Sequence, residues 1–206
     1  MRSKSKSSPA LSLPIIVEQA LALLDEVGFD GLSTRALASK LGIAGPSLYW
    51  HVKNKQTLLS HMAEAMFMAN LPTPSKRKQS WQKWLKAGAI CIRDAACSHR
   101  DGARVIAASH PTGSIDILSF PAMLKRLTDE GFSEDQARYA FLVMSRYTLG
   151  WVLAEQGEGD VGKHGPKKGY EFGLDTIVNG LELQLVNDAK TKGTNTKRKS
   201  ITAKKT

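Results

Sequence analysis

The chain has 206 residues, of which 42% are hydrophobic, so wholesale disorder is excluded and one large domain, or a small one joined to a larger one, is expected. It has 29 Lys and Arg residues against 19 Asp and Glu residues, a formal net charge of +10. Two cysteines are too few for a disulfide framework, and no run of about 18 apolar residues predicts a membrane span. Glu18 and Gln19 interrupt the first apolar stretch, which argues against a signal peptide, so we expect a cytoplasmic protein.

The excess positive charge lies at the two ends of the chain. Residues 1–8 hold three basic residues and residues 190–206 hold seven, with no acid in either stretch, so residues 9–189 hold 19 charges of each sign. After residue 188 the chain is also almost free of large apolar groups. We therefore predict a flexible basic tail over residues 1–13 and a disordered basic tail over residues 189–206.

Residues 14–71 are predicted to form a small domain of short helices. Apolar residues recur with helical spacing over residues 14–27, and Gly28 follows as a stop. Residues that favour helix ends delimit the next three helices: Ser33 and Gly42 flank the second, Pro46 begins the third, which runs to His51, and Asn54 caps the fourth. Past Leu71, two prolines and three adjacent cations break the spacing and indicate a domain boundary.

Residues 72–188 are predicted to form a second, larger helical domain. Helical spacing indicates five helices, over residues 81–92, 101–108, 115–129, 134–156 and 170–186. Five glycines and a proline over residues 157–169 predict a mobile loop before the last helix. Because no strand-like alternation or internal repeat is present, the fold class is predicted to be all-α.

Residues 34–53 have the pattern of a helix-turn-helix. Two short helices that cross closely need a small residue at the crossing, here Ala38, and a sharp turn, here at Gly42. Four cations and no carboxylate lie between residues 31 and 63: Arg35, Lys40, Lys53 and Lys55. Cations and hydroxyls around a recognition helix suit the phosphates of DNA. The alternative, a solvated helix pair with scattered charge, does not account for the complete turn pattern.

This helix-turn-helix, followed by Leu48-Tyr-Trp-His-Val-Lys-Asn-Lys55, resembles the tetracycline-repressor (TetR) family of bacterial transcriptional regulators. Segments of the second half resemble the same family, namely residues 98–105, 110–112, 131–133, 147–150, 172–174 and 180–182, so the likeness covers residues 14–187. It implies a homodimer with a three-helix helix-turn-helix DNA-binding domain and a larger helical ligand-binding and dimerisation domain. The last two long helices would form a four-helix bundle with those of the partner.

The helix predicted over residues 134–156 bears on this dimer independently of the resemblance. Apolar residues lie on all of its sides, and such a helix must be covered on every side. Burial against a second copy would satisfy this requirement, and a thick monomer core is the alternative.

The resemblance implies nine DNA-contacting positions: Thr34, Arg35, Gly45, Pro46, Ser47, Tyr49, Trp50, His51 and Lys55. Arg35 is the candidate for bidentate reading of a guanine. Thr34, Ser47, Tyr49 and Lys55 are expected to hold phosphates, and Trp50 is expected to lie partly in the core. Gly45 stands where the family pattern has a base-reading glutamine, so we expect a palindromic operator of different sequence.

The resemblance also implies a ligand pocket in each subunit that spreads the two recognition helices when it is filled. The positions that hold a magnesium–tetracycline chelate in the family carry Leu71, Gly88, Ile92, Ile106, His110 and Ala154 here. Ile106 replaces the metal-binding histidine and Ala154 a carboxylate, and neither side chain offers the oxygen that a hard cation requires. We therefore expect no metal, no cofactor and no tetracycline.

A largely apolar small molecule is the effector that these positions favour, oriented by few polar groups. The predicted ligand-binding residues are Leu71, Gly88, Ile92, Ile106, Ser109, His110, Pro111, Met123 and Met144. The alternative is a DNA-binding regulator without small-molecule control, or one controlled by a protein partner.

No catalytic or metal-binding constellation competes with this interpretation. His99-Arg-Asp101 imitates a kinase triplet, but Ile106 stands where that loop needs a metal-binding asparagine. The cysteines and nearby histidines match no closed zinc pattern. We therefore predict a regulator and not an enzyme, with duplex operator DNA, a second copy of the chain and an unidentified effector as its partners and no membrane association.

Overall fold

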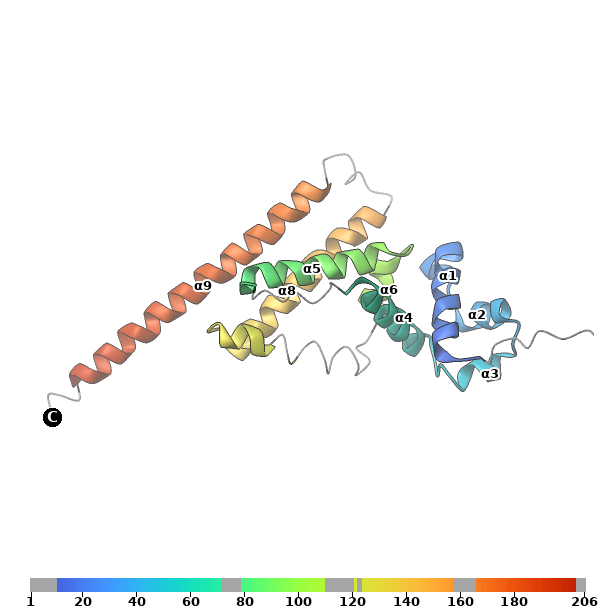
Figure 1. Ribbon diagram of the computed structural model, residues 1–206, viewed down its shortest axis with the longest axis horizontal. Coiled ribbons are helices and arrows are strands. Elements are labelled where there is room, and N and C mark those ends of the chain that lie inside the picture. The colour runs from blue at the N-terminus through green and yellow to red at the C-terminus, as the bar shows by residue number, and fades with distance from the viewer. Residues whose placement is uncertain (1–10, 72–78, 110–120, 122–123, 158–165, 203–206) are drawn as a thin grey trace, which may run out of the picture. The chain divides into compact units, whose positions relative to one another are not determined.

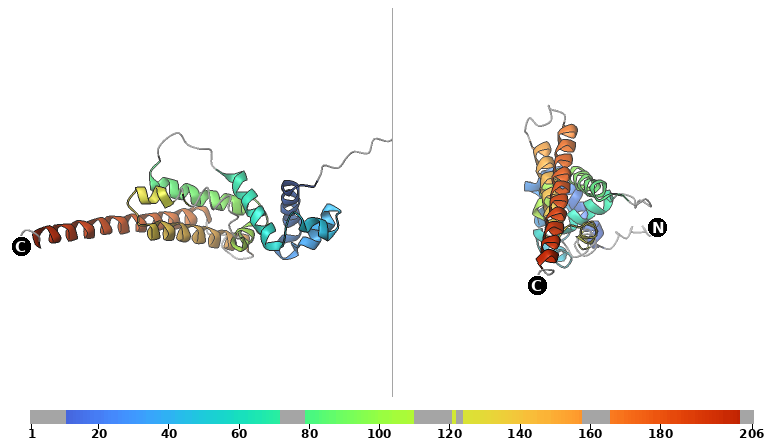
Figure 2. Two further views of the ribbon diagram at one scale, coloured as in Figure 1. Left: turned by 90° about the horizontal axis from the view of Figure 1, so that it is seen from below. Right: turned by 90° about the vertical axis from the view of Figure 1, so that its left-hand side faces the viewer.

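The computed structural model describes residues 11–71, 79–109, 121, 124–157 and 166–202, with side chains through Lys190 apart from residues 166 and 189. Every regular element in these ranges is a helix (Figures 1 and 2), as the all-α prediction requires. The chain divides into two compact units. The first contains residues 1–71 and 94–112, and the second contains residues 72–93 and 113–206.

The described residues of the first unit include the last turn of α5 (Trp81–Cys97) and five complete helices: α1 (Leu13–Gly31), α2 (Thr34–Leu41), α3 (Gly45–Tyr49), α4 (Lys55–Asn70) and α6 (Gly102–Ala108). The predicted caps are confirmed, because the Ser33 side chain accepts a hydrogen bond from the Ala36 amide and Asn54 accepts one from Thr57. Gly28 interrupts α1 as expected, with a φ of 71°, but one further helical turn follows it. The third helix ends at Tyr49, two residues before the predicted end.

The core of the first unit joins α1 to α4 through fully buried apolar side chains: Ile16, Leu24, Leu37, Leu48, Val52, Leu58, Met62 and Met66. Gly102, the first residue of α6, lies tightly against this core. A Cβ built there would meet the Ala96 carbonyl oxygen at 2.3 Å and the Met66 methyl at 2.8 Å. Glycine is therefore required for α6 to lie against α4.

The second unit contains α8 (Glu134–Gln156), α9 (Pro166–Thr202), most of α5 (Trp81–Cys97) and helical residues 124–129. A capping box of Ser133 and Gln136 begins α8 at the predicted residue. The buried Tyr170 of α9 joins the three helices, because its hydroxyl donates to the Ala89 carbonyl of α5 and lies 3.0 Å from the Thr148 hydroxyl of α8. The expected helix over 115–129 is described only at its C-terminal end.

The last helix is much longer than predicted. It begins at Pro166, inside the loop expected over 157–169, and continues to Thr202, through the tail expected to be disordered. Proline is tolerated in a first helical turn, and no other proline follows it up to residue 202. Gly169 is a packing residue, since a Cβ there would lie 2.7 Å from the Trp151 ring. Both predictions are therefore wrong for residues 166–169 and 189–202, and residues 158–165 lie outside the described ranges.

None of the helices in the described ranges combines the length and the hydropathy needed to cross a membrane.

Candidate nucleic-acid interface

The helix-turn-helix of the first unit has the geometry that its sequence predicts. Gly42 ends α2 in the left-handed region with a φ of 66°, where glycine has no steric cost. The chain then turns back, and the Ile43 amide donates to the Ala38 carbonyl at 3.1 Å. Ala38 is 5% exposed and Leu48 is 1% exposed, so the small residue of α2 and the apolar residue of α3 both lie in the core. These contacts hold α3 at a defined angle to α2.

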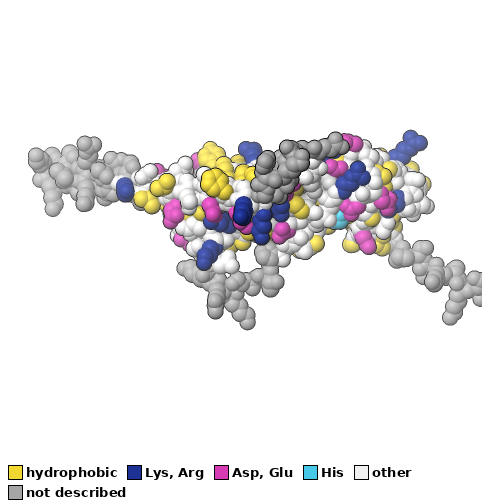
Figure 3. Space-filling view, turned by 90° about the horizontal axis from the view of Figure 1, so that it is seen from above, with side chains coloured by type: hydrophobic (Ala, Val, Ile, Leu, Met, Phe, Trp, Pro, Cys, Tyr) yellow, Lys and Arg dark blue, Asp and Glu magenta, His cyan; other side chains and the backbone are white. Residues whose placement is uncertain are grey.

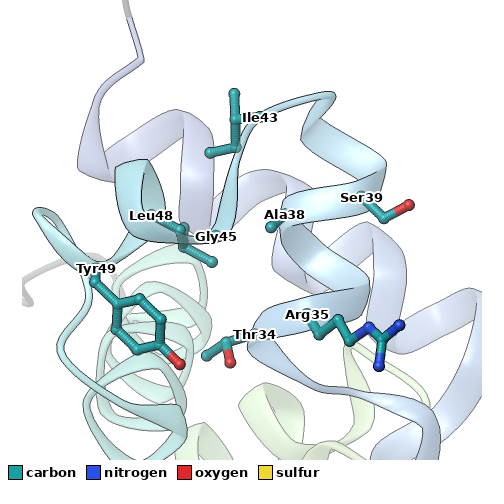
Figure 4. Close-up of a pocket in the computed structure, with 8 residues that line it drawn as sticks. All are labelled: Thr34, Arg35, Ala38, Ser39, Ile43, Gly45, Leu48 and Tyr49. Carbon is teal, nitrogen blue, oxygen red and sulfur yellow. The ribbon is translucent and has the colours of Figure 1, made fainter.

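A groove of about 310 Å³ lies between α2 and α3 (Figure 4). Its lining combines buried apolar groups with polar side chains: Thr34, Arg35, Ala38, Ser39, Ile43, Gly45, Leu48 and Tyr49. In this view the Tyr49 ring points toward Thr34, whereas the Arg35 side chain extends from the other side of α2. A Cβ built at Gly45 would meet no atom within 4 Å, so this position faces open space.

Most of the predicted DNA-contacting residues are exposed on this part of the unit. Arg35, Pro46, Ser47, Tyr49, Trp50 and His51 are exposed, while Thr34, Gly45 and Lys55 are partly buried. Trp50 is 90% exposed, so the expectation that it lies partly in the core is wrong. Because α3 ends at Tyr49, the core positions around the following turn are taken by Leu48 and Val52, whose amide donates to the Leu48 carbonyl at 2.9 Å.

The acids at the end of α1 each have a hydrogen-bonding partner in the same unit. Asp25 accepts the Arg100 amide and lies 2.8 Å from His99 Nδ1, and Glu26 pairs with Lys40. The guanidinium of Arg104 donates to both oxygens of Asp30, at 2.7 and 2.9 Å. These hydrogen bonds lower the pKa of the Asp30 carboxyl and raise the pKa of Arg104.

By contrast, neither Arg35 nor Lys53 forms an ion pair with a described residue. Glu26 and Asp30 at the end of α1 thus pair with Lys40 and Arg104, whereas Arg35 and Lys53 are exposed to solvent. The helix-turn-helix surface therefore carries positive charge that can meet phosphates.

Two family models match the chain, one in each of the predicted domains. Residues 16–62 match the model for bacterial regulatory proteins of the tetR family, and residues 73–169 match the tetracyclin repressor-like C-terminal domain. The tetracycline repressor protein class C of Escherichia coli is 36% identical over an alignment of 195 residues, and the match covers 81% of this chain and 89% of that protein. The chain belongs to the TetR family of bacterial regulatory proteins.

Solved structures of TetR proteins have the same fold. A TetR variant from Acinetobacter baumannii AYE in complex with minocycline gives a TM-score of 0.77 at 36% identity, over 85% of this chain and 98% of that chain. TetR class A in complex with 5a,6-anhydrotetracycline and magnesium gives a TM-score of 0.70 at 40% identity, over 82% of this chain and 96% of that chain. The resemblance predicted in both halves is therefore confirmed, and so is the prediction of a regulator rather than an enzyme.

Six of the nine predicted ligand-binding residues of this TetR-family chain lie in the described ranges, in both units. In the first unit, Leu71 is 55% exposed after α4, Ile106 is 8% exposed in α6, and the Ser109 hydroxyl donates to the Ile106 carbonyl at 2.7 Å. In the second unit, Gly88 is exposed, Ile92 is partly buried and Met144 is buried in the core. His110, Pro111 and Met123 lie outside the described residues, and the pocket stays a prediction.

No group of three or more His, Cys, Asp or Glu side chains in the described ranges could hold a metal ion. Cys91, which is partly buried, and Cys97, which is exposed, lie on α5 and are not joined to each other by a disulfide. The described residues thus contain neither a metal cluster nor a disulfide.

The sequence interpretation missed one cluster, at the junction of α1, α4 and α6. Phe29 contacts Lys55 and Arg104, while its amide donates to Asp101 at 2.9 Å. Acids at 25–30 and cations at 99–104 are visible in the sequence, but about 70 residues separate them. Only the fold shows that they meet.

Proposed function

We propose that this protein is a homodimeric transcriptional repressor that binds a palindromic operator and is released by a small, largely apolar ligand without magnesium. DNA binding is a property of the TetR family, whereas the palindromic operator, the homodimer and the apolar ligand are what we propose for this protein. The observation that carries the proposal is the exposed set of polar and aromatic side chains on α2 and α3, which surrounds the buried residues Ala38 and Leu48, while Glu26 and Asp30 at the end of α1 are paired. A bacterial cytoplasm is the compartment in which such a regulator meets DNA.

The roles of the DNA-contacting residues follow from their chemistry and exposure. Arg35 is exposed near the start of α2, and a guanidinium can donate two hydrogen bonds to the O6 and N7 atoms of guanine. Hydroxyls of Ser47 and Tyr49 suit phosphate oxygens, which set the register of the protein on the duplex. Trp50, almost fully exposed, offers a flat apolar surface to the sugar-phosphate backbone.

Homodimer formation is supported by apolar side chains that one chain leaves uncovered. On α8, the side of Ala140, Met144 and Val152 is buried, whereas the other side exposes apolar groups: Tyr139, Val143 and Leu153. On α9 the corresponding exposed residues are Phe172, Leu183 and Val186. Figure 3 shows hydrophobic side chains at the surface of the second unit among charged ones. Exposed apolar side chains on one side of each of two long helices indicate a protein interface, which favours the dimer over the thick monomer core.

The residues present do not fit the magnesium ion that TetR class A holds with its ligand. Ile106 stands where the family has a metal-binding histidine, and its side chain is buried and offers no donor atom. Magnesium prefers oxygen ligands in octahedral geometry. We therefore propose an effector recognised by apolar contact, with no metal between it and the protein.

Selection of binding sites from random duplexes tests the DNA part of the proposal. The full chain should enrich a palindrome whose half-sites lie about one helical turn apart, and each half-site should contain a guanine that Arg35 reads. Sedimentation of the protein–DNA complex should give two chains per duplex. Enrichment of asymmetric sites, or binding by one chain, would contradict the proposal.

Addition of ligands to the preformed complex tests the effector part. Tetracycline with magnesium chloride should leave operator binding unchanged, with the E. coli class C repressor on its own operator as the positive control. Release of the selected duplex by magnesium–tetracycline would show that the pocket still accommodates the chelate.

A further inference from the structure

We propose that Phe29 is a positioning residue for the phosphate contact of Lys55 and that it couples this contact to α6. The proposal rests on the proposed function, in which Lys55 binds DNA. Phe29 is only partly buried, so core packing alone does not account for an aromatic side chain there. Its ring, amide and carbonyl each have a partner, and the partners come from two other helices.

Gly28 creates the turn that presents Phe29. Its φ of 71° breaks α1, and it is buried, with a built Cβ only 2.9 Å from the Asp101 carboxylate. The Phe29 amide, freed from the helix, donates to that same carboxylate at 2.9 Å. Asp101 is the N-cap residue of α6, so the backbone at Phe29 is attached directly to the start of α6.

Two cations contact the Phe29 ring. The Lys55 ammonium lies 4.8 Å from the ring centroid, and the Arg104 guanidinium carbon lies 4.5 Å from it. Arg104 is itself held by Asp30 through two hydrogen bonds. Since both cations lie within the range of a cation–π interaction, the ring links Lys55 at the start of α4 to Arg104 on α6.

This arrangement orients the Lys55 ammonium without using up its hydrogen-bonding capacity. The ammonium has three N–H donors, and one of them points to the Phe29 carbonyl oxygen at 3.4 Å. The remaining donors can reach a phosphate. A lysine side chain loses considerable rotamer entropy when it is fixed, and here the fold has already restricted it before DNA arrives. Phe29 should therefore strengthen the phosphate contact by pre-organisation.

A double-mutant cycle tests the proposal on the selected operator, with affinity measured as a function of salt. Phe29→Leu keeps an apolar side chain but removes the ring, and we expect about two- to fivefold weaker binding, the equivalent of a cation–π contact at an exposed site. Lys55→Gln should lower the log-affinity versus log-salt slope by about 0.9. In the Lys55→Gln background, Phe29→Leu should have no further effect, and Phe29→Tyr should retain the affinity of the unmodified chain.

The coupling to α6 is tested with Arg104→Gln. This change should weaken binding in the unmodified chain but not in the Phe29→Leu chain, because the Phe29 ring is what links Arg104 to Lys55. Thermal unfolding of each variant shows whether the fold is retained.

Three results would overturn the proposal. If Phe29→Leu weakens binding equally with and without Lys55, the role of Phe29 is structural only. If it leaves affinity unchanged or increases it, the ring does not orient Lys55 for phosphate. If Lys55→Gln itself changes neither affinity nor slope, Lys55 does not contact DNA, whereas the base reading assigned to Arg35 is decided by its own variant.

Discussion

Two surfaces of the molecule expose side chains that a partner could cover, and one surface is polar whereas the other is apolar. The helix-turn-helix surface exposes Arg35, Ser47 and Tyr49 around the groove between α2 and α3. The outer sides of α8 and α9 expose Tyr139, Phe172 and Leu183, the last two at 74% and 65%. Hydrogen-bond donors suit a charged, hydrated partner, whereas an apolar face suits a partner that excludes water. The same chain therefore has one surface that suits DNA and another that suits a protein partner.

The two surfaces are also expected to depend on one another. A palindromic operator is read by two recognition helices at once, and their spacing is set by the dimer. The apolar face should therefore control the affinity of the polar one, although it contacts no DNA.

Leu183→Glu is the variant expected to have the largest effect. A carboxylate on the outer side of α9 would have to be buried unpaired in the dimer, which is strongly unfavourable. We expect monomers in sedimentation and about 10²- to 10⁴-fold weaker binding to the palindrome, because the second half-site no longer adds to affinity. Met68→Glu, a change at an equally exposed apolar residue of α4, is the matched control and should leave the protein dimeric. A dimeric Leu183→Glu chain would show that α9 does not form the interface.

Arg35→Ala should have the next largest effect, and it acts on the DNA surface alone. Loss of a bidentate guanine contact costs about 1–3 kcal/mol of specific binding and leaves non-specific binding nearly unchanged. Lys53→Ala is the control at an exposed cation of the same unit, and it should weaken binding to all duplexes alike. Equal losses on operator and scrambled DNA for Arg35→Ala would show that it contacts phosphates and does not read a base.

Gly45→Gln should change the preference for one base pair of the half-site without unfolding the protein. The position faces open space. Gly45 is not one of the glycines in the left-handed region, so a residue with a side chain can take its place without backbone strain. The new amide can pair with an adenine, which discriminates against other bases by about 1–3 kcal/mol. Repeating the site selection with this variant is the measurement. An unchanged consensus would place residue 45 away from the base edges.

Removal of residues 190–206 should have the smallest effect, confined to salt dependence. The segment holds seven cations and no acid, and the preceding residues 9–189 are neutral in sum. Each phosphate contact that is lost should lower the log-affinity versus log-salt slope by about 0.9, while operator preference stays the same. A tail with the same residues in shuffled order should restore the slope. An unchanged slope after truncation would show that the tail does not contact the DNA.

Local features of the fold were predictable from short stretches of sequence. Ser33, Gly42 and Asn54 mark helix ends through contacts within a few residues, and all three act as predicted. The capping box that begins α8 is equally local. The end of the last helix was not predictable in this way, because a polar, basic stretch without proline is compatible with either disorder or helix.

The exposed positions of the helix-turn-helix were also predictable, with one exception. Trp50 is exposed because the helix ends before it, and a shift of one or two residues in a helix end decides which side chain faces the core. Tryptophan is highly buried on average, so only the path of the backbone shows that this one is exposed.

The excess charge of +10 and the helix-turn-helix pattern are properties of the sequence, and together they indicate a DNA-binding protein whose net charge resides in its tails. The tertiary structure decided how the acids at the end of α1 are used. Asp25 and Asp30 pair with His99 and Arg104, and Phe29 lies between Lys55 and Arg104. No sequence pattern predicts such pairs, because they form only when packing of α6 against α1 and α4 brings distant residues together.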